Sequence, residues 1–242
     1  MKKQLTISLI IAAYNEEKYI GDCLEYALQN ADGYIYEIIV VDNNSSDNTR
    51  KIAEEYTGVK IIIEKQKWPT FARQRWYKES TGDILAFIDA DTRMPIWRAK
   101  KISEQFAHDS TLWVITGPYT FYDLPWYGFV YSWIYYPTIV TYLVSFLFGG
   151  ICVGGNFAIK RTVLKKMNGF DTRILFYGDD TDIARRAKYF AKVKYMLSFK
   201  MPTSSRRYKQ QGIRATGYQY VVQYIRTNFL HKKPPTEYQD FR

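Results

Sequence analysis

The chain has 242 residues, of which 47% are apolar and 24% are charged, and its formal net charge is +10. This composition excludes a disordered chain and a repeat protein and predicts a globular unit with a substantial core. The positive charge is concentrated between residues 183 and 236, which hold 13 lysines and arginines and no aspartate or glutamate. Such a region favours a diphosphate ligand or an anionic bilayer, although a solvated basic surface is the simpler alternative. We expect no nucleic-acid partner, because no nucleic-acid-binding motif accompanies the charge.

Short apolar runs alternate with helical patterns over the first hundred residues. Nearly continuous Ile, Leu and Val strands separated by helices predict a parallel sheet that is buried on both faces. The expected fold class is therefore α/β, a Rossmann-like fold with a mostly parallel central sheet covered by helices on both faces. We expect strands at 5–12, 37–41, 59–63 and 84–88, and helices at 17–29, 48–56, 70–80 and 96–107.

The first apolar run follows Lys2 and Lys3 and is superficially similar to a short signal peptide. It continues directly into Asn15-Glu16-Glu17 and lacks a convincing cleavage site. We therefore interpret it as a buried first strand.

Polar residues follow three of the predicted strands, as Tyr14-Asn15-Glu16, Asp42-Asn43-Asn44 and Asp89-Ala90-Asp91. In open α/β sheets, ligands bind beyond the carboxyl ends of the strands. Two carboxylates one residue apart suit Mg²⁺ or Mn²⁺, which often bind substrate phosphates as well. A carboxylate such as Asp42 can also hydrogen-bond a ribose. An ordinary turn or helix cap remains the alternative for each motif.

The segment 124–159 contains no charged residue. Its most apolar part is about long enough to span a bilayer. A single crossing would separate Asp89 and Asp91 from the later acidic cluster, so that they could not share one site. An interfacial hairpin or a buried core element avoids this conflict. We expect one of these two; the hairpin would make peripheral membrane contact and the core element would not. The expected location is cytoplasmic, at the inner face of the membrane.

Asp179-Asp180-Thr181-Asp182 is a third acidic site, which we place at the start of a helix. Negative charge there can simply complement the helix macrodipole. Alternatively, Asp180 is a base that removes a proton from an acceptor hydroxyl. Gly154-Gly155-Asn156 precedes this site, and its glycines permit either close approach of a ligand or an ordinary bulge. Arg73 and Arg206 are candidate phosphate contacts, with a surface ion pair as the alternative for each.

The order and spacing of these landmarks resemble the family 2 glycosyltransferases over roughly residues 5 to 207. The resemblance implies a GT-A fold with a nucleotide-sugar-binding half, 1–118, and an acceptor-binding half, 119–242, in one continuous domain. The second half holds the apolar segment 124–159 and the basic C-terminal region. The matching motifs are Ile10-Ile11-Ala12-Ala13-Tyr14-Asn15-Glu16, Val40-Val41-Asp42, Asp89-Ala90-Asp91, Gly154-Gly155-Asn156, Asn168-Gly169-Phe170-Asp171, and Asp179-Asp180-Thr181-Asp182 followed by Arg185.

The resemblance also implies a role for each matching position. Asp180 would be the catalytic base of an inverting transfer, and Asp91 would ligate Mn²⁺ or Mg²⁺ on the diphosphate. The family usually has Glu-Asp where this chain has Asp179-Asp180, a departure that keeps the second carboxylate. The implied partners are a nucleotide diphosphate sugar donor and a glycan or lipid-linked acceptor. The remaining implied contacts are Ala13, Tyr14, Glu16, Asp42, Arg73 and Asp89 for the donor, Gly155, Asn156 and Asp179 for the acceptor, and Arg206 for a phosphate.

Two other functions compete with this interpretation. A sugar-phosphate nucleotidyltransferase would present a glycine-rich basic loop after the first strand, where this chain has the acidic sequence Tyr14-Asn15-Glu16-Glu17. A non-catalytic membrane-docking protein would explain the basic region and the aromatic segment. It would leave the three acidic motifs without a purpose.

Overall fold

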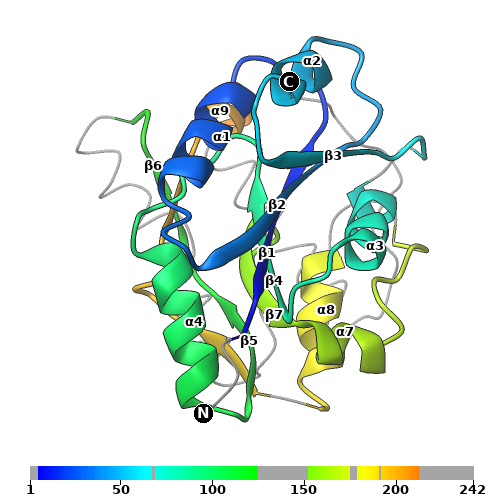
Figure 1. Ribbon diagram of the computed structural model, residues 1–242, viewed down its shortest axis with the longest axis vertical. Helices are drawn as coiled ribbons and strands as arrows, with labels where there is room; N and C mark the ends of the chain where they lie inside the picture. The colour runs from blue at the N-terminus through cyan, green and yellow to red at the C-terminus, as the bar shows by residue number, and fades with distance from the viewer. Residues whose placement is uncertain (1–4, 67–68, 125–151, 175–178, 191, 213–242) are drawn as a thin grey trace.

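The computed structural model describes residues 5–66, 69–124, 152–174, 179–190 and 192–212. Its central sheet has seven strands in the order β3-β2-β1-β4-β7-β5-β8 (Figure 1). Neighbouring strands are parallel, except that β7 is antiparallel to both β4 and β5. The strands are β1 (Ile7–Ala13), β2 (Ile35–Asp42), β3 (Val59–Ile63), β4 (Ile84–Asp89), β5 (Leu112–Thr116), β7 (Asn156–Lys160) and β8 (Lys192–Tyr195).

Helices cover both faces of this sheet (Figure 1). Apolar residues of α1, α2 and α4 join one hydrophobic cluster with the strands, and those of α3, α7 and α8 join a second cluster on the opposite face. The helices are α1 (Ile20–Gln29), α2 (Thr49–Glu54), α3 (Pro69–Glu79), α4 (Arg98–His108), α7 (Arg161–Lys166) and α8 (Asp179–Ala187).

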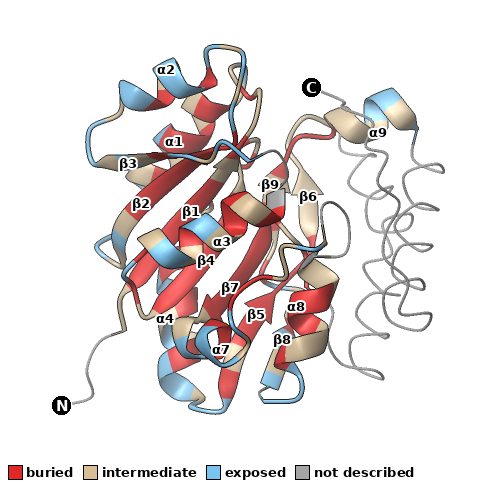
Figure 2. Cartoon of the chain, turned by 90° about the vertical axis from the view of Figure 1, so that its right-hand side faces the viewer, coloured by how far each residue is buried: buried red, intermediate tan, exposed pale blue. Residues whose placement is uncertain are grey.

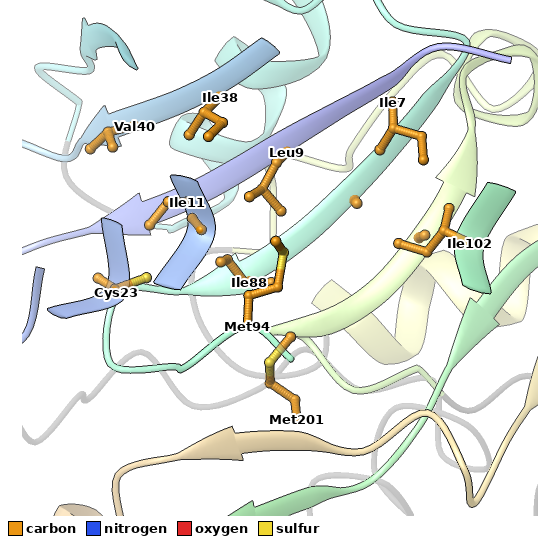
Figure 3. Packing of buried hydrophobic residues seen from close by; sticks show 14 of the residues in the cluster. Ile7, Leu9, Ile11, Cys23, Ile38, Val40, Ile88, Met94, Ile102 and Met201 are labelled. Carbon is orange, nitrogen blue, oxygen red and sulfur yellow. The ribbon is translucent and has the colours of Figure 1, made fainter. Parts of the chain in front are cut away.

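Successive side chains of the central strands enter different clusters. Leu9 and Ile11 of β1 pack in the same cluster as Cys23 of α1 (Figure 3), whereas Ile10 lies in the cluster that contains Trp76 of α3. The central strands are consequently buried along most of their length (Figure 2). Burial on both faces explains why their sequences are apolar without the alternation of a half-exposed strand.

The predicted fold class is confirmed, since the sheet is mostly parallel and has helices on both faces. The four predicted strands and four predicted helices all form, and their ends lie within three residues of the expected positions. The antiparallel strand β7 was not predicted. It starts directly after Gly154-Gly155, and Arg161 at its end donates hydrogen bonds to the carbonyl oxygens of Gly82 (2.7 Å) and Tyr77 (2.9 Å). These bonds attach the second half of the chain to the start of β4.

A second, two-stranded sheet lies at the carboxyl edge of β4. It consists of β6 (Tyr119–Phe121) and β9 (Met201–Thr203), which are parallel, and α9 (Arg206–Gln211) follows β9. An isolated bridge joins Thr92 to Thr203. This attachment brings α9 to the turn after β4, although more than a hundred residues separate the two in the sequence.

Within the described ranges, no helix combines the length and the apolar character needed to cross a membrane. The segment 124–159 falls largely outside those ranges, because residues 125–151 are not described. Membrane contact therefore stays a prediction. The division at residues 118 and 119 also stays a prediction, and β7 of the second half lies between β4 and β5 of the first.

Candidate active site

The register of the parallel strands places three of the predicted donor residues at one edge of the sheet. Asp42 at the end of β2 is the register partner of Ala13, and Asp89 at the end of β4 is the partner of Ala12. Asp42 is buried, and its Oδ1 accepts a hydrogen bond from the backbone N–H of Ser45 (3.1 Å). The three strand ends therefore present Ala13, Asp42 and Asp89 side by side.

The loop after β1 is held by the loop after β2. The backbone N–H of Asn15 donates to the Ser45 hydroxyl (2.9 Å), and that of Glu16 donates to the Thr49 hydroxyl (2.6 Å). Asn15 itself adopts a left-handed conformation, with φ of 52°, which asparagine tolerates better than most residues. These bonds fix the course of the chain through Tyr14 and turn the Glu16 side chain toward the protein.

An ion triad joins this loop to the turn after β4 and to α9. The guanidinium of Arg206 binds both carboxylate oxygens of Glu16, at 2.6 and 2.5 Å, and its Nη2 lies 3.1 Å from Oδ2 of Asp91. Glu16, Asp91 and Arg206 keep at most 18% of their side-chain surface exposed. Arg206 was predicted to contact a phosphate, but in this structure two carboxylates bind it, because opposite charges shielded from water pair strongly.

The protonation of Asp91 is shifted by this environment. Burial raises the pKa of Asp91 to about 7, the Arg206 guanidinium opposes the rise, and the negative charges of Glu16 and Asp89 add to it. The pKa of Arg206 is raised above its ordinary value, because its hydrogen bonds to Glu16 and the charge of Asp91 outweigh the effect of burial. Asp91 is thus a buried carboxylate whose negative charge requires a cation beside it.

The residues around Asp91 fit a divalent metal that takes some of its ligands from the protein and the others from water and a substrate. In the described part of the chain, no group of three or more His, Cys, Asp or Glu side chains is arranged as a metal site. Mg²⁺ and Mn²⁺ are commonly held by one or two carboxylates together with water and substrate phosphates. Asp91, with Asp89 two residues before it, supplies hard oxygen atoms of this kind.

Asp89 is held by the second half of the chain. Its Oδ2 accepts a hydrogen bond from the Tyr119 hydroxyl (2.8 Å), and the same hydroxyl oxygen accepts one from the backbone N–H of Gly155 (2.9 Å). The hydroxyl of Thr203 similarly donates to Oδ1 of Asp91 (3.1 Å). Each carboxylate of the Asp89-Ala90-Asp91 motif therefore has a hydroxyl neighbour from the β6–β9 sheet.

Asp180 lies next to the same pair of glycines. Its Oδ2 accepts a hydrogen bond from the backbone N–H of Gly154 (3.1 Å), and its Oδ1 accepts one from the N–H of Thr181 (2.7 Å). A Cβ atom on Gly154 would lie 2.9 Å from Nη2 of Arg73 and 3.3 Å from Oδ2 of Asp180. Arg73 and Asp180 thus both lie beside Gly154, and Asp89 lies beside the adjacent Gly155. The side chain of Asp179, a predicted acceptor contact, lies outside the described part.

Asn156 has a different position from the one predicted. It was expected to bind the acceptor, but it is fully buried, and its amide donates to the carbonyl oxygens of Gly117, Pro118 and Phe199 at 2.7–3.1 Å. Its Oδ1 accepts a hydrogen bond from Arg98 (2.5 Å). A side chain whose donors and acceptor are used inside the core cannot also bind an external ligand, so Asn156 is a structural residue.

Three residues at or below the site were not identified from the sequence: Tyr119, Thr203 and Arg98. Arg98 is fully buried over the ring of Phe199, and burial lowers its pKa to about 9. Tyr119 is one of 22 tyrosines, and nothing adjacent in the sequence distinguishes it. Only the pairing of β6 with β9 indicates that it lies beside Asp89.

Comparison with known proteins identifies the family of this chain. Residues 8–167 match the family model described as "Glycosyl transferase family 2". A dolichol-phosphate mannosyltransferase of Pyrococcus furiosus is 27% identical over 233 residues, which cover 88% of this chain and 58% of that protein. Glycosyltransferase AglE of Haloferax volcanii is 38% identical over 91 residues, covering 35% of this chain and 30% of that protein. The chain thus spans less than two thirds of the length of these relatives.

Solved structures share the fold. A mannosyltransferase of Pyrobaculum calidifontis in complex with GDP-Man and Mn²⁺ has a TM-score of 0.71 at 20% identity, covering 97% of this chain and 67% of that chain. Glucosyl-3-phosphoglycerate synthase of Mycobacterium tuberculosis in complex with Mn²⁺, UDP and glucosyl-3-phosphoglycerate has a TM-score of 0.65 at 18% identity, covering 91% of this chain and 79% of that chain. The family match covers more than half of the chain, and the fold agrees with it. The chain therefore belongs to family 2 of the glycosyltransferases.

Proposed function

We propose that this chain transfers a sugar from a nucleotide diphosphate sugar to an acceptor hydroxyl with inversion of the anomeric carbon and with the help of a divalent metal. One observation carries the proposal: the carboxylates of Asp89 and Asp180 lie beside the adjacent residues Gly155 and Gly154. A donor bound along the carboxyl edge of the sheet would then have its reacting end beside the carboxylate of Asp180.

The donor side of the proposal uses the residues at the three strand ends. Ala13 and Tyr14 would enclose the base, Asp42 would contact the nucleoside, and Asp89 would contact the ribose. Asp91 would hold Mn²⁺ or Mg²⁺, which offsets the charge that develops on a leaving diphosphate. The Mn²⁺ in the solved structures of similar fold supports this choice of cofactor.

Arg206 has a second part in the proposal. Its guanidinium compensates the charges of Glu16 and Asp91. A metal at Asp91 would take over part of that compensation. Arg206 would then be able to bind a phosphate oxygen, as arginine commonly does.

Asp180 is the proposed catalytic base. It would accept the proton of the acceptor hydroxyl while the hydroxyl oxygen attacks the anomeric carbon from the face opposite the diphosphate. The nucleoside diphosphate leaves in the same step, so the configuration inverts. The N–H groups of Gly154 and Thr181 orient the carboxylate for this step. Arg73 beside Gly154 would contact the donor, and Gly155 and Asp179 would line the acceptor side.

We infer that the acceptor is a glycan or a lipid-linked molecule. The names of the relatives support this: one is a dolichol-phosphate mannosyltransferase, and another is an undecaprenyl-phosphate 4-deoxy-4-formamido-L-arabinose transferase of Proteus mirabilis, 30% identical over 97 residues. The charge-free segment 124–159 and the basic C-terminal region suit a protein that meets its acceptor at the inner face of the membrane.

A thermal-shift panel of UDP, GDP and dTDP, each with and without Mn²⁺, tests the donor site. A ligand at 100 times its Kd stabilises a protein by about 2.7 kcal/mol, which corresponds to roughly 5–10 °C for a chain of this size. We expect one nucleotide to produce such a shift only with Mn²⁺. Incubation with the matching nucleotide sugar and a lipid-linked sugar, which offers free hydroxyl groups, should then release the nucleoside diphosphate.

Two results would refute this proposal. If none of the nucleotides stabilises the protein, the edge of the sheet is not a donor site. If the protein instead forms pyrophosphate from a nucleoside triphosphate and a sugar phosphate, it is a nucleotidyltransferase, in which the same carboxylates would bind a triphosphate.

A further inference from the structure

Tyr119 links the two halves of the candidate site through a single hydroxyl group. It lies on β6, outside the motifs of the first half, and its side chain is partly buried against the core. The hydroxyl hydrogen is donated to Oδ2 of Asp89 at 2.8 Å, and the hydroxyl oxygen accepts the N–H of Gly155 at 2.9 Å. The hydroxyl therefore donates to the end of β4 and accepts from the backbone just before β7.

The close approach of Asp89 to Gly155 leaves no space for a side chain at position 155. A Cβ atom on Gly155 would lie 2.0 Å from Oδ2 of Asp89 and 2.4 Å from the Tyr119 hydroxyl oxygen. Neither distance is compatible with a side chain, so residue 155 must be glycine for the carboxylate to reach this position. The backbone at Gly155 and the Tyr119 hydroxyl together confine Oδ2 of Asp89.

The neighbouring N–H group holds the other carboxylate. Gly154 donates directly to Asp180, and Gly155 reaches Asp89 through Tyr119. Two consecutive backbone N–H groups thus set the spacing between the carboxylate proposed to contact the ribose and the carboxylate proposed as base. Removal of the Tyr119 hydroxyl would release the carboxylate of Asp89 and leave the carboxylate of Asp180 in place.

We propose that Tyr119 is a positioning residue that orients Asp89 toward the donor ribose by engaging Oδ2 and presenting Oδ1 to the ligand. This inference rests on the proposed function, because it concerns the residue that orients Asp89 for the donor contact proposed there. A carboxylate that is already oriented loses less rotational freedom when a ligand binds, so the link should strengthen nucleotide binding. It should do little to the chemical step, in which Asp180 acts.

The test is the variant Tyr119→Phe, which keeps the ring and removes the hydroxyl. The probe is whichever of UDP, GDP and dTDP gives the largest thermal shift, titrated calorimetrically with Mn²⁺. We expect its Kd, and the KM of the corresponding nucleotide sugar, to rise about tenfold, the effect of one hydrogen bond to a charged group. The kcat should stay within about twofold of the wild type.

Tyr56→Phe is the matched control. The Tyr56 hydroxyl, just after α2, donates to the carbonyl oxygen of Gly21 at 3.1 Å and has Oε1 of Glu25 at 3.5 Å, so this variant also removes a hydrogen-bonded tyrosine hydroxyl. The melting temperatures of both variants should fall by similar small amounts. Only Tyr119→Phe should weaken nucleotide binding, and an equal loss in both variants would overturn the inference.

A double-mutant cycle separates positioning from general packing. In an Asp89→Asn background, Tyr119→Phe should change the Kd by less than about twofold, because the carboxylate that it orients is gone. Equal effects of Tyr119→Phe in both backgrounds would overturn the inference, as would wild-type affinity in Tyr119→Phe itself. If the wild-type chain binds none of the three nucleotides, the proposed function fails and the inference fails with it.

Discussion

On the β1–β4 side of the sheet, the candidate site residues stand at the ends of apolar strands, whereas on the β7–β8 side they are interspersed with buried polar residues. Ala13, Asp42 and Asp89 are aligned by the register of parallel strands. Around β7 and α8, Asn156 and Asp182 hold the fold through side-chain hydrogen bonds. A polar residue in the first region is therefore a candidate for ligand binding, and one in the second region is equally a candidate for structural support.

The motif at the start of α8 contains both kinds of residue. Asp180 contacts the N–H groups of Gly154 and Thr181. Asp182, two residues later, is buried and binds Arg185 at 2.7 Å and Arg186 at 2.6 Å. Arg186 in turn donates to the carbonyl oxygens of Met167 and Gly169. The sequence Asp-Asp-Thr-Asp thus serves the candidate site with one carboxylate and the packing of α8 with another.

The largest effect on activity should come from Asp180→Asn. An amide cannot accept the proton of the acceptor hydroxyl, so the transfer rate should fall by about 10²–10⁴-fold, the usual contribution of a positioned base. The nucleotide Kd should stay within about twofold, since the proposed donor contacts other than Arg73 lie at or just after the ends of β1, β2 and β4. Single-turnover transfer and calorimetric titration measure the two quantities. Turnover like that of the wild type would remove Asp180 from its role.

The largest effect on stability should come from Asn156→Ala. This change leaves the buried guanidinium of Arg98 without its amide partner and exposes three carbonyl oxygens to a cavity. Each buried donor or acceptor left without a partner costs about 1–3 kcal/mol, and a charged group costs more, so urea denaturation should show a loss of several kcal/mol. A variant that is as stable as the wild type but has a raised acceptor KM would restore the acceptor-binding role that the sequence suggested.

An intermediate effect should follow from Asp91→Asn in the first region. If Asp91 holds the metal, the nucleotide affinity measured with Mn²⁺ should fall about ten- to a hundredfold in the variant. The nucleotide affinity measured without metal should change little. Titrations with and without Mn²⁺ separate the two. If Mn²⁺ raised the nucleotide affinity of the variant as much as that of the wild type, the metal would be held by ligands other than Asp91.

The sequence was sufficient to predict the parallel sheet and the residues at its edge, because buried strands are continuous apolar runs and polar residues mark their ends. It was not sufficient for Asn156, because an asparagine after two glycines has the same local sequence whether it faces a ligand or three carbonyl groups. It was not sufficient for Arg206 either, since the contact with Glu16 joins residues 190 positions apart. Such contacts depend on the antiparallel insertion of β7 and on the pairing of β6 with β9.

The smallest of these effects should come from Asp182→Asn, and it is the sharpest counterpart to Asp180→Asn. An amide keeps one acceptor oxygen for the two arginines and loses the charge, so the protein should be destabilised by about 1–2 kcal/mol. Transfer by the remaining folded protein should be close to that of the wild type. If transfer instead fell as far as in Asp180→Asn, at unchanged stability, then both carboxylates of α8 would take part in the reaction, and the division of this motif into a site residue and a packing residue would be wrong.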